Sequence, residues 1–313
     1  MQIITLTLSP AFDVHCLCDH FTPFGESLAS VTSREAGGKG VNISRALAQN
    51  HVSNLAIVAL GEDNATDFTN LLSKSNVDFT PIYRSGRIRE NITIHTAGKA
   101  ETRISFSGFS ADESLLSEAE TIICTKLDAS DSTILTLTGR VPDGVSMDEV
   151  KAFLKRLKGM GIRLVIDSKS FSTEDILEIK PFLIKPNEEE LALYASCEIC
   201  DESDIWESAK ALFGQGIENV MISLGAKGAI LACQDGYFRA FPPKIDAIST
   251  IGAGDSSIAG FLAAYSSSQP LCDCLCNAVA FGCAACLTPG THPPLPHDVE
   301  RIRKQVRVDI LTR

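Results

Sequence analysis

The stretch Ser249-Thr250-Ile251-Gly252-Ala253-Gly254-Asp255 decides how the rest of this chain is interpreted. Two glycines flank an alanine and precede an acid, and the small and apolar residues that follow indicate a helix. Gly252 and Gly254 leave backbone N–H groups uncovered at a helix start, where anions bind well. An acid beside such an anion site has a role if it takes a proton from a nucleophile that attacks the anion. Asp255 is therefore a candidate base for phosphoryl transfer; the alternative is an ordinary loop-to-helix turn with an Asp near its start.

The composition is that of a folded, acidic protein. The chain has 313 residues, 44% of them hydrophobic, which is enough for one large α/β domain or two smaller ones. Its formal net charge of −11 argues against a general nucleic-acid binder, and it means that an anionic substrate would need a local basic patch. No apolar run approaches about 18 residues, so we expect no transmembrane helix and no membrane partner.

The start of the chain and its cysteines indicate a cytoplasmic protein. Residues 1–4 lack a basic region and are typical of a strand rather than a signal peptide. Eleven cysteines in a chain of this length are expected to be reduced thiols. Five of them, Cys272, Cys274, Cys276, Cys283 and Cys286, gather near the C-terminus in a spacing that suits zinc poorly. All of these except Cys274 fall on one stripe of a helix, so we interpret that stripe as small, buried packing residues.

Helical and extended patterns alternate regularly along most of the chain. The expected strands are 3–8, 57–60, 133–138, 163–167, 182–185 and 220–224, followed by a hairpin of 229–233 and 237–241. The first expected helix begins at 36. Further helices are expected at 63–75, 112–127, 147–159, 173–180, 188–194, 204–215, 255–266, 272–286 and 297–306. This alternation predicts an α/β fold with a mostly parallel sheet covered by helices on both faces.

Residues 79–109 break this alternation. Ile92 and Ile94 alternate with polar Asn91 and Thr93, which predicts an antiparallel hairpin with one polar face. The segment is also locally basic, with Arg84, Arg87, Arg89, Lys99 and Arg103 against Glu90 and Glu101. It is either the basic patch that an anionic substrate requires or a solvated hairpin face.

Polar residues follow several of the expected strands at the point where each strand ends. They are Asp13, Gly139-Arg140, Asp167, Lys185-Pro186-Asn187 and Ser223-Leu224-Gly225. In open α/β sheets ligands bind beyond the carboxyl ends of the strands, so this edge predicts a cleft. The chain has no Gly-x-x-x-x-Gly-Lys-Ser/Thr motif and no Gly-x-Gly-x-x-Gly after its first strand. These absences argue against a P-loop enzyme and a dinucleotide-binding dehydrogenase.

Phosphoryl transfer needs a cradle for phosphates, a metal ion and a base, and this edge offers candidates for each. The glycine stretch that precedes Asp255 forms the cradle, and Asp255 is the base. Glu190, on the helix after Asn187, is placed to orient Mg²⁺, with water among the other ligands. The stretch 223–228 would lie along a nucleotide.

Three sequence segments resemble motifs of the PfkB (ribokinase-like) carbohydrate kinases and occur in the same order along the chain. Residues 36–45 (Ala-Gly-Gly-Lys-Gly-Val-Asn-Ile-Ser-Arg) resemble the N-terminal motif of the family. Residues 249–262 resemble its C-terminal motif, with Asp255 in the position of the catalytic base. Residues 185–191 (Lys-Pro-Asn-Glu-Glu-Glu-Leu) resemble its metal and nucleotide motif, Lys-Pro-Asn-x-x-Glu-Leu. The resemblance runs the length of the chain and implies a kinase that uses ATP and Mg²⁺.

Two further segments resemble the hexose-phosphate branch of this family, which contains 1-phosphofructokinase, tagatose-6-phosphate kinase and a minor 6-phosphofructokinase. Residues 5–13 resemble the Thr-x-Asn-Pro-Ala-x-Asp start of the branch, with Ser9 in place of Asn, and Asp13 would hold sugar hydroxyls. Residues 87–91 resemble its Arg-x-Arg-x-Asn strand. A sugar that already carries a phosphate needs guanidinium groups, which bind phosphate through paired hydrogen bonds, whereas a neutral sugar does not.

The resemblance implies a substrate and a set of contacts. We expect fructose 1-phosphate as the acceptor, with tagatose 6-phosphate and fructose 6-phosphate as alternatives. The competing classes are a sugar-phosphate sensor without catalysis and a kinase for a neutral sugar or nucleoside. The implied acceptor site is Asp13, Gly38, Lys39, Asn42, Arg89, Asn91, Arg103 and Arg140, in which Arg89, Lys39 and Arg103 hold the existing phosphate. The implied nucleotide site is Lys185, Asn187, Ser223, Gly225 and Gly228, and Glu190 serves the metal.

Two departures from the branch leave the identity of the sugar open. Arg140 stands in Thr-Gly-Arg-Val-Pro, where the branch usually has Ser-Gly-Ser-x-Pro. A large cation therefore lies where a small hydroxyl is expected, and it either adds a phosphate contact or narrows the acceptor site. Thr93 stands where 1-phosphofructokinases often have Lys.

The resemblance also implies a domain organisation. A three-layer α/β/α body would comprise residues 1–10, 36–80 and 111–313, and a β-sheet lid would comprise residues 11–35 and 81–110. In relatives the lid often pairs between two subunits, and an uncovered strand edge favours pairing, so we expect a homodimer through the lid. Lid closure would exclude water, which competes as acceptor. Binding of a monovalent cation near the loop 246–250 is left open.

Overall fold

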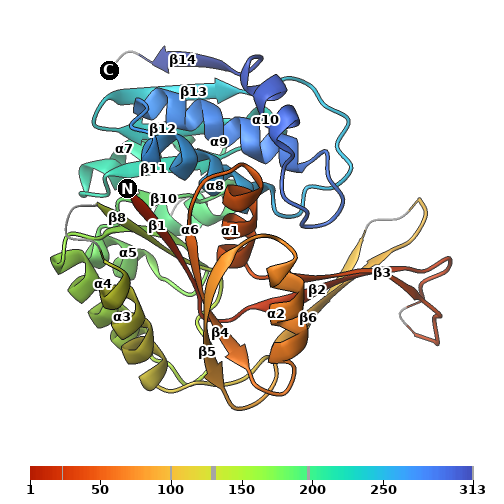
Figure 1. The fold of residues 1–313 in the computed structure, drawn as a ribbon. Helices are drawn as coiled ribbons and strands as arrows, with labels where there is room; N and C mark the ends of the chain where they lie inside the picture. The colour runs from red at the N-terminus through yellow and green to blue at the C-terminus, as the bar shows by residue number, and fades with distance from the viewer. Residues whose placement is uncertain (23, 99–100, 128–131, 196–197, 312–313) are drawn as a thin grey trace.

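The computed structural model describes residues 1–22, 24–98, 101–127, 132–195 and 198–311 (Figure 1). Across the large sheet the strands run in the order β14 (Arg307–Leu311), β13 (Gly236–Phe241), β12 (Ala229–Cys233), β11 (Asn219–Ser223), β10 (Leu183–Ile184), β9 (Arg163–Asp167), β8 (Thr133–Thr138), β1 (Gln2–Thr7), β4 (Leu55–Gly61) and β5 (Asp78–Arg84). A smaller sheet has the order β3 (Ser30–Gly37), β2 (Ala11–Leu17), β6 (Arg89–His95) and β7 (Thr102–Ser105).

The large sheet is parallel over most of its width. The strands from β5 across to β11 pair in parallel, and β12, β13 and β14 continue the sheet in antiparallel pairing. The central strands β1 and β8 are buried on both faces, as expected for a parallel sheet that helices cover on both sides. The carboxyl ends of the parallel strands lie at one edge, which brings the residues after each strand together.

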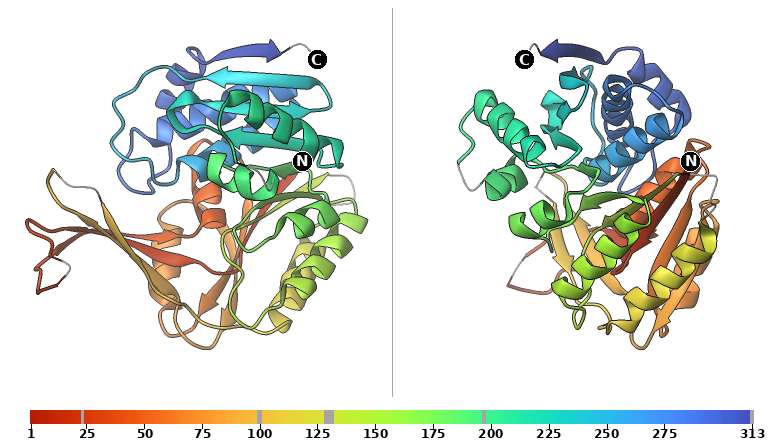
Figure 2. Two further views of the ribbon diagram at one scale, coloured as in Figure 1. Left: turned by 180° about the vertical axis from the view of Figure 1, so that it is seen from behind. Right: turned by 90° about the vertical axis from the view of Figure 1, so that its left-hand side faces the viewer.

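Helices form a layer on each face of the large sheet (Figure 2). They are α1 (Lys39–Gln49), α2 (Ala65–Ser73), α3 (Ser114–Lys126), α4 (Met147–Gly159), α5 (Thr173–Ile179), α6 (Glu188–Ala195), α7 (Glu202–Gly214), α8 (Ala253–Ser266), α9 (Leu271–Ala285) and α10 (Pro296–Arg303). Side chains of α3, α4, α5 and α7 pack on one face, and those of α1, α8, α9 and α10 pack on the other. None of the described helices is long and apolar enough to cross a membrane.

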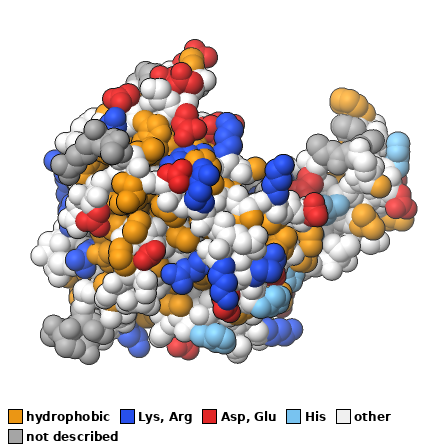
Figure 3. Space-filling view, turned by 90° about the horizontal axis from the view of Figure 1, so that it is seen from above, with side chains coloured by type: hydrophobic (Ala, Val, Ile, Leu, Met, Phe, Trp, Pro, Cys, Tyr) orange, Lys and Arg blue, Asp and Glu red, His pale blue; other side chains and the backbone are white. Residues whose placement is uncertain are grey.

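The small sheet, called the lid below, has two different faces. β2 is parallel to β6 and antiparallel to β3, and β6 and β7 form the predicted antiparallel hairpin. On one face Asp13 and Asn91 are partners across neighbouring strands, and both are buried. Ile92 and Ile104 pair on the opposite face, where Ile104 is 42% exposed; Val31 of β3 is 65% exposed. Figure 3 shows hydrophobic side chains on the part of the lid that projects from the body.

The predicted fold class is confirmed: a mostly parallel sheet lies between two helical layers and carries a small β-sheet lid. Several details of the prediction are wrong. Residues 36 and 37 end β3 of the lid rather than open a helix of the body, and α1 begins at Lys39. Residues 78–84 form β5, which pairs with β4 at the edge of the large sheet, so 81–84 belong to the body rather than to the lid. Because β5 is an edge strand, it tolerates Pro81. In addition, α10 ends at Arg303 rather than at 306, and β14, which was not predicted, follows it.

Because β5 belongs to the body, the predicted basic patch on the lid contains fewer cations than expected. Arg84 lies on β5, where its Nη2 is 3.0 Å from Oε1 of Glu118 on α3, so it does not belong to the lid. Arg87 is exposed, and Lys99 lies outside the described residues. Arg89 and Arg103 remain on the polar face of the lid.

Candidate active site

Asp255 lies in the first turn of α8, where the glycine stretch leads into the helix. Gly252 adopts a φ of +79°, a left-handed conformation that a side chain would strain. Asp255 is only 8% exposed, and this burial raises its pKa to about 6, although Lys39 and Asn42 oppose the shift. Nδ2 of Asn42 donates a hydrogen bond of 2.8 Å to Oδ2 of Asp255. The result is a carboxylate whose pKa is close to neutrality, as a general base requires.

A second buried carboxylate, Asp167, lies between two lysines at the end of β9. Its Oδ2 is 2.9 Å from Nζ of Lys39 and 3.8 Å from Nζ of Lys185. Burial alone would raise the pKa of Asp167, but Lys185 and Lys39 hold it below its usual value. Asp167 was not among the predicted site residues, although its position directly after a buried strand was a usable signal. It positions both lysines at the edge of the sheet where Asp255 lies.

Lys185 reaches the glycine stretch that precedes Asp255. A Cβ atom on Gly254 would lie 3.2 Å from Nζ of Lys185, so the missing side chain leaves room between the ammonium group and the backbone. The Lys185 side chain is 7% exposed, and it was predicted to bind the nucleotide. An anion at this place would meet both the ammonium group and the N–H groups at the start of α8.

On the lid, Asp13 of β2 forms a third carboxylate site. It accepts a hydrogen bond of 2.8 Å from Nδ2 of Asn91, and Nη2 of Arg103 lies 3.4 Å from the same oxygen. Burial raises the pKa of Asp13, while Asn91 and Arg103 oppose the shift. Gly37 approaches this carboxylate so closely that a side chain at position 37 would collide with it. The next residue, Gly38, is the N-cap of α1, so the lid carboxylate and the start of α1 are adjacent.

Two of the predicted arginines, Arg89 and Arg103, lie close to Asp13 and its partner Asn91. Nη1 of Arg89 donates a hydrogen bond of 2.8 Å to Oδ1 of Asn91. Burial lowers the pKa of Arg89, and the charges of Arg140 and Arg103 lower it further, while Asp13 opposes them. The structure thus places Arg89 and Arg103 on the lid beside Asn91 and Asp13, whereas Arg140 follows β8 of the body.

Lys39 does not belong to this arginine group. Burial alone would lower the pKa of Lys39, but Asp167 and Asp255, and to a smaller extent Glu190, raise it. None of these acids acts on Arg89. Lys39 was predicted to hold the existing phosphate of the acceptor together with Arg89. Its position beside Asp167 and Asp255 instead suits a contact with the group that is transferred.

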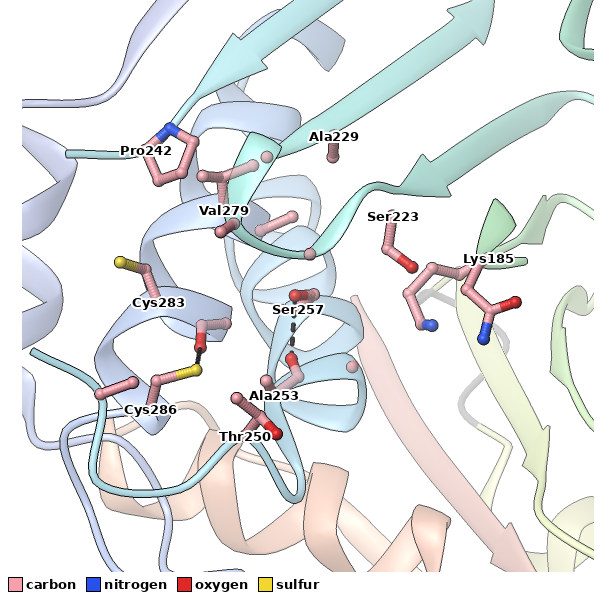
Figure 4. Close-up of a pocket in the computed structure, with 18 of the residues that line it drawn as sticks. Lys185, Ser223, Ala229, Pro242, Thr250, Ala253, Ser257, Val279, Cys283 and Cys286 are labelled. Atoms are coloured by element: carbon pink, nitrogen blue, oxygen red, sulfur yellow. Dashed lines mark hydrogen bonds between the residues drawn. The ribbon is translucent and has the colours of Figure 1, made fainter. Parts of the chain in front are cut away.

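A pocket of about 1110 Å³ adjoins the start of α8. Its volume suits a nucleotide, since sites for small molecules enclose about 300–1,000 Å³. All five residues predicted to bind the nucleotide line this pocket, namely Lys185, Asn187, Ser223, Gly225 and Gly228. Ala253 and Gly254 line it too, so the pocket continues into the anion cradle. In Figure 4, Lys185 and Ser223 lie on one side of the pocket.

The opposite wall of this pocket is largely apolar and includes Val279, Cys283 and Cys286 (Figure 4). The interpretation of the C-terminal cysteines as buried packing residues is therefore wrong for these two. Cys274, which we placed off the buried stripe, is fully buried, whereas the other four are partly exposed. Burial raises the pKa of Cys283 to about 11, so its thiol is protonated at neutral pH.

Glu190 and Asn187 begin α6 with two reciprocal hydrogen bonds. N of Asn187 donates to Oε2 of Glu190 at 3.2 Å, and N of Glu190 donates to Oδ1 of Asn187 at 2.7 Å. The second carboxylate oxygen of Glu190, Oε1, lies 3.8 Å from Nζ of Lys169. Glu190 lines the nucleotide pocket, so one carboxylate oxygen fits a Mg²⁺ ion that takes its other ligands from phosphates and water. Within the described ranges, no group of three or more His, Cys, Asp or Glu side chains is arranged around a metal position.

Comparison with known sequences identifies one family. A model of the pfkB family carbohydrate kinases matches residues 13–298. The 1-phosphofructokinase of Vibrio cholerae is 30% identical over 259 residues, which cover 83% of this chain and 81% of that protein. The 1-phosphofructokinase of Escherichia coli K12 is 31% identical over 261 residues, which cover 83% of each. The ATP-dependent 6-phosphofructokinase isozyme 2 of the same strain is 27% identical over 305 residues, which cover 96% of this chain and 98% of that protein.

Comparison with solved structures also finds phosphofructokinases. Phosphofructokinase-2 from Escherichia coli in complex with potassium superposes with a TM-score of 0.90 at 26% identity, covering 97% of this chain and 98% of that one. A possible 1-phosphofructokinase from Thermotoga maritima superposes with a TM-score of 0.82 over the whole of both chains; at 19% identity this is a likeness of fold alone.

Proposed function

Because the chain belongs to the pfkB family of carbohydrate kinases, as its motifs predicted, we propose that it phosphorylates a ketohexose phosphate with ATP. Fructose 1-phosphate is the proposed acceptor, which gives fructose 1,6-bisphosphate. Tagatose 6-phosphate and fructose 6-phosphate are the alternatives, and the likeness to a 6-phosphofructokinase supports the second. The observation that carries the proposal is a buried base, Asp255, with a pKa of about 6, at the edge of a pocket of nucleotide size.

The reaction forms a bond between the acceptor hydroxyl oxygen and the γ-phosphorus of ATP and breaks the bond from that phosphorus to the β–γ bridging oxygen. Asp255 accepts the proton of the hydroxyl, and Asn42 orients its carboxylate through the 2.8 Å hydrogen bond. The N–H groups of Gly252 to Gly254 bind the transferring phosphoryl group at the start of α8. Lys39 and Lys185 offset its negative charge from the opposite side.

The acceptor lies against the polar face of the lid. Asp13, held by Asn91, accepts hydrogen bonds from the sugar hydroxyls. Arg89 and Arg103 bind the phosphate that the sugar already carries, because guanidinium groups match phosphate geometry. A neutral sugar would offer no phosphate to these two guanidinium groups, of which Arg89 is half-buried and Arg103 exposed.

The cofactors follow from the family and from the residues of the pocket. Mg²⁺, when bound, neutralises charge on the phosphates, and Glu190 is the side chain that would hold it, directly or through water. The similar Escherichia coli structure is described in complex with potassium. We propose that a monovalent cation also binds to this chain, beside the loop 246–250. In this loop the Ser249 hydroxyl accepts a 3.2 Å hydrogen bond from N of Ile251. Activity in KCl compared with tetramethylammonium chloride tests this part.

We also propose a homodimer through the apolar face of the lid, and a cytoplasmic location in keeping with the free thiols of the described cysteines. Ile104 and Val31 are exposed on the lid, and a second copy of the same surface would cover them. Ile104→Lys should shift the sedimentation coefficient toward the monomer. The matched change Leu193→Lys, at a 74% exposed position on α6, should leave it unchanged. A wild-type protein that sediments as a monomer would contradict the proposed homodimer. A similar structure, of phosphofructokinase-2 from Escherichia coli, is described as tetrameric, so the sedimentation measurement should also cover larger assemblies.

The test of the function is ADP release with four acceptors: fructose 1-phosphate, tagatose 6-phosphate, fructose 6-phosphate and unphosphorylated fructose. Asp255→Asn serves as the blank. We expect a clear preference for fructose 1-phosphate. Activity on fructose alone would contradict the role of the lid arginines. Binding of a sugar phosphate without ADP release would favour a sensor, the competing class that needs no base.

A further inference from the structure

A second cavity, of about 560 Å³, lies at the amino ends of the parallel strands, and we call it the amino-edge cavity. Three neighbouring strands contribute to its wall: Arg163 and Asn219 begin β9 and β11, and Phe182 directly precedes β10. Tyr265, in the last turn of α8, lines it from another side. The catalytic edge lies at the carboxyl ends of the same strands, and none of the described residues lines both cavities. The amino-edge cavity is therefore separate from the active site.

The deep part of this cavity is aromatic. Phe182 is 4% exposed, and its ring centroid lies 4.8 Å from that of Tyr265. The guanidinium carbon of Arg163 is 5.8 Å from the first ring centroid and 5.9 Å from the second. In a close stack the separation is smaller, as between Arg34 and Phe12, where it is 3.8 Å. Arg163 thus leaves ring surface for an apolar or aromatic group of a ligand.

One buried acceptor in the cavity wall lacks a donor. Asn219 is 2% exposed, and its Nδ2 donates a hydrogen bond of 2.8 Å to O of Phe182. Its Oδ1 is also buried, but no donor among the described residues reaches it. A buried acceptor without a hydrogen bond costs free energy. A ligand that brings an N–H group to this oxygen is therefore favoured.

The cavity also presents charges of both signs that the protein does not pair. Among the residues that the structure describes, the side chains of Arg163, Glu218 and Asp235 form no hydrogen bond or ion pair. A further cation lies behind Gly216 in the wall, since a Cβ atom there would be 3.4 Å from Nζ of Lys180. A ligand with one charge would meet a like charge on one side of the cavity, whereas a zwitterion meets an opposite charge on both.

We propose that the amino-edge cavity binds a free α-amino acid with an apolar or aromatic side chain. The carboxylate pairs with the guanidinium group of Arg163, and the ammonium group donates to Oδ1 of Asn219 and faces Glu218. The side chain packs on the rings of Phe182 and Tyr265. This site goes beyond the proposed kinase reaction and is independent of it, because no residue assigned to the active site takes part.

The first experiment varies the ligand. L-phenylalanine and L-leucine are titrated calorimetrically into the full chain, beside two analogues that each lack one charge, N-acetyl-L-phenylalanine and phenethylamine. We expect both amino acids to bind, and each analogue to bind at least about 10-fold more weakly than L-phenylalanine, because it loses a charge-assisted hydrogen bond. A non-hydrolysable ATP analogue in the nucleotide pocket should leave the affinity for L-phenylalanine within about twofold, as expected for uncoupled sites.

The second experiment varies the protein. Arg163→Gln should weaken the binding of L-phenylalanine by about 10-fold or more and leave that of phenethylamine, which has no carboxylate, unchanged. Arg307→Gln is the matched control, because Arg307 also begins a strand and lies 4.4 Å from the ring centroid of Phe241, but it does not line the cavity. If Arg163→Gln folds poorly by circular dichroism, Glu218→Gln at an exposed position replaces it. That variant should weaken L-phenylalanine more than N-acetyl-L-phenylalanine.

Several results would overturn the inference. The first is that neither amino acid binds with a Kd below about 1 mM. The second is phenethylamine binding as tightly as L-phenylalanine, which would make the cavity a site for amines. Equal affinities for L-phenylalanine in Arg163→Gln and Arg307→Gln would remove the carboxylate contact, and displacement by the ATP analogue would place the amino acid in the nucleotide pocket. None of these measurements uses kinase activity, so this inference and the proposed function fail separately.

Discussion

Nδ2 of Asn42 donates a 2.8 Å hydrogen bond to Oδ2 of Asp255, although 213 residues separate the two in the chain. The contact joins the first turns of α1 and α8, which carry the two glycine motifs recognised in the sequence. Burial favours the protonated form of Asp255, and Asn42 opposes it by bonding to the charged form. With the charge of Lys39, which opposes burial more strongly than Asn42 does, the result is a pKa of about 6, so the carboxylate is ionised at neutral pH but still able to accept a proton.

Replacement of Asp255 by Asn should abolish most of the activity and leave the fold intact. Asn has the same shape and can still meet Asn42, but it cannot accept the proton of the acceptor hydroxyl. We expect turnover to fall by roughly 10²–10⁴-fold or more. ADP release under saturating substrates measures this. Unchanged turnover would show that another group is the base.

The same variant should be at least as stable as the wild type at pH 7.5. The pKa of Asp255 is raised from 3.8 to about 6, so its stabilising contribution is complete below pH 3.8 and is lost as the pH rises through about 6. This corresponds to roughly 3 kcal/mol of unfolding free energy that the ionised carboxylate costs and that Asn does not. Urea unfolding at pH 7.5 and at pH 4 measures the difference, which should shrink at the lower pH. Asp235→Asn, at an exposed position, is the control, and a variant less stable than wild type at pH 7.5 would contradict the argument.

The acid limb of the pH profile should depend on Asn42. For the wild type we expect kcat/KM to fall below about pH 6 as Asp255 becomes protonated. A phosphate monoester also titrates near pH 6, so the wild-type profile alone does not identify the group. Asn42→Ala removes a hydrogen bond that lowers the pKa of Asp255, so the acid limb should move to higher pH. If the acid limb of kcat/KM lies at the same pH in Asn42→Ala as in the wild type, it reports protonation of the substrate phosphate rather than of Asp255.

Lys39 and Arg89 should give different kinetic defects. Lys39→Met removes a charge beside Asp255, so we expect kcat to fall by roughly 10²–10³-fold with little change in the KM of the sugar phosphate. Arg89→Met removes a contact to the existing phosphate, so the KM of the sugar phosphate should rise by about 10- to 100-fold while the KM of ATP is unchanged. If Lys39→Met raises only the KM of the sugar phosphate, then Lys39 binds the acceptor phosphate as its sequence motif predicted.

Glu35 should be important for stability because it joins the lid to the body. Its Oε2 accepts hydrogen bonds from Nη2 of Arg45 at 2.9 Å and from Oγ1 of Thr291 at 3.0 Å, and its Oε1 is 3.1 Å from Nδ1 of His292. Burial would raise the pKa of Glu35, but His292 and Arg45 lower it to about 2. Glu35→Gln leaves the buried Arg45 without its counter-charge, so we expect the unfolding free energy at pH 7 to fall by about 3–5 kcal/mol.

Urea unfolding at several pH values checks this prediction. The folded pKa of Glu35 is below 4.5, so its contribution is complete above pH 4.5 and is lost as the pH falls toward 2. Glu90→Gln is the control, because the Glu90–Arg34 pair is 37% and 34% exposed and should be worth about 1 kcal/mol or less. Equal losses in the two variants would show that Glu35 acts as an ordinary surface pair.

The sequence was sufficient for the features that depend on local chemistry. The glycine stretch before Asp255 predicted a helix start with an acid in its first turn, and α8 begins there. Regular alternation predicted most strands and helices because a buried parallel sheet requires long apolar runs. Asn187 and Glu190 were recognised through spacing, and their reciprocal hydrogen bonds explain why the motif holds those residues three apart.

Features that depend on which distant segments meet could not be predicted. The ion pair of Lys39 with Asp167, at 2.9 Å across 128 residues of chain, is one such feature: the position of Asp167 after a strand was visible in the sequence, but its partner was not. Residues 81–84 of β5 were assigned to the lid because the sheet partner of this strand, β4, is not encoded in its own pattern. The cysteines of α9 show a similar limit: helical spacing gives a stripe, but only the packed structure shows that Cys283 faces the nucleotide pocket.

The position of β1 between β4 and β8 has a consequence for the protein while it is being synthesised. One edge of β1 can pair as soon as residue 61 has left the ribosome, but its other edge stays open until residue 138 has emerged. During that interval the nascent chain exposes an apolar strand edge, which makes it a natural client for chaperones. Asn42 likewise waits for Asp255, which emerges much later. Until residue 255 has emerged, the site therefore lacks the proposed base.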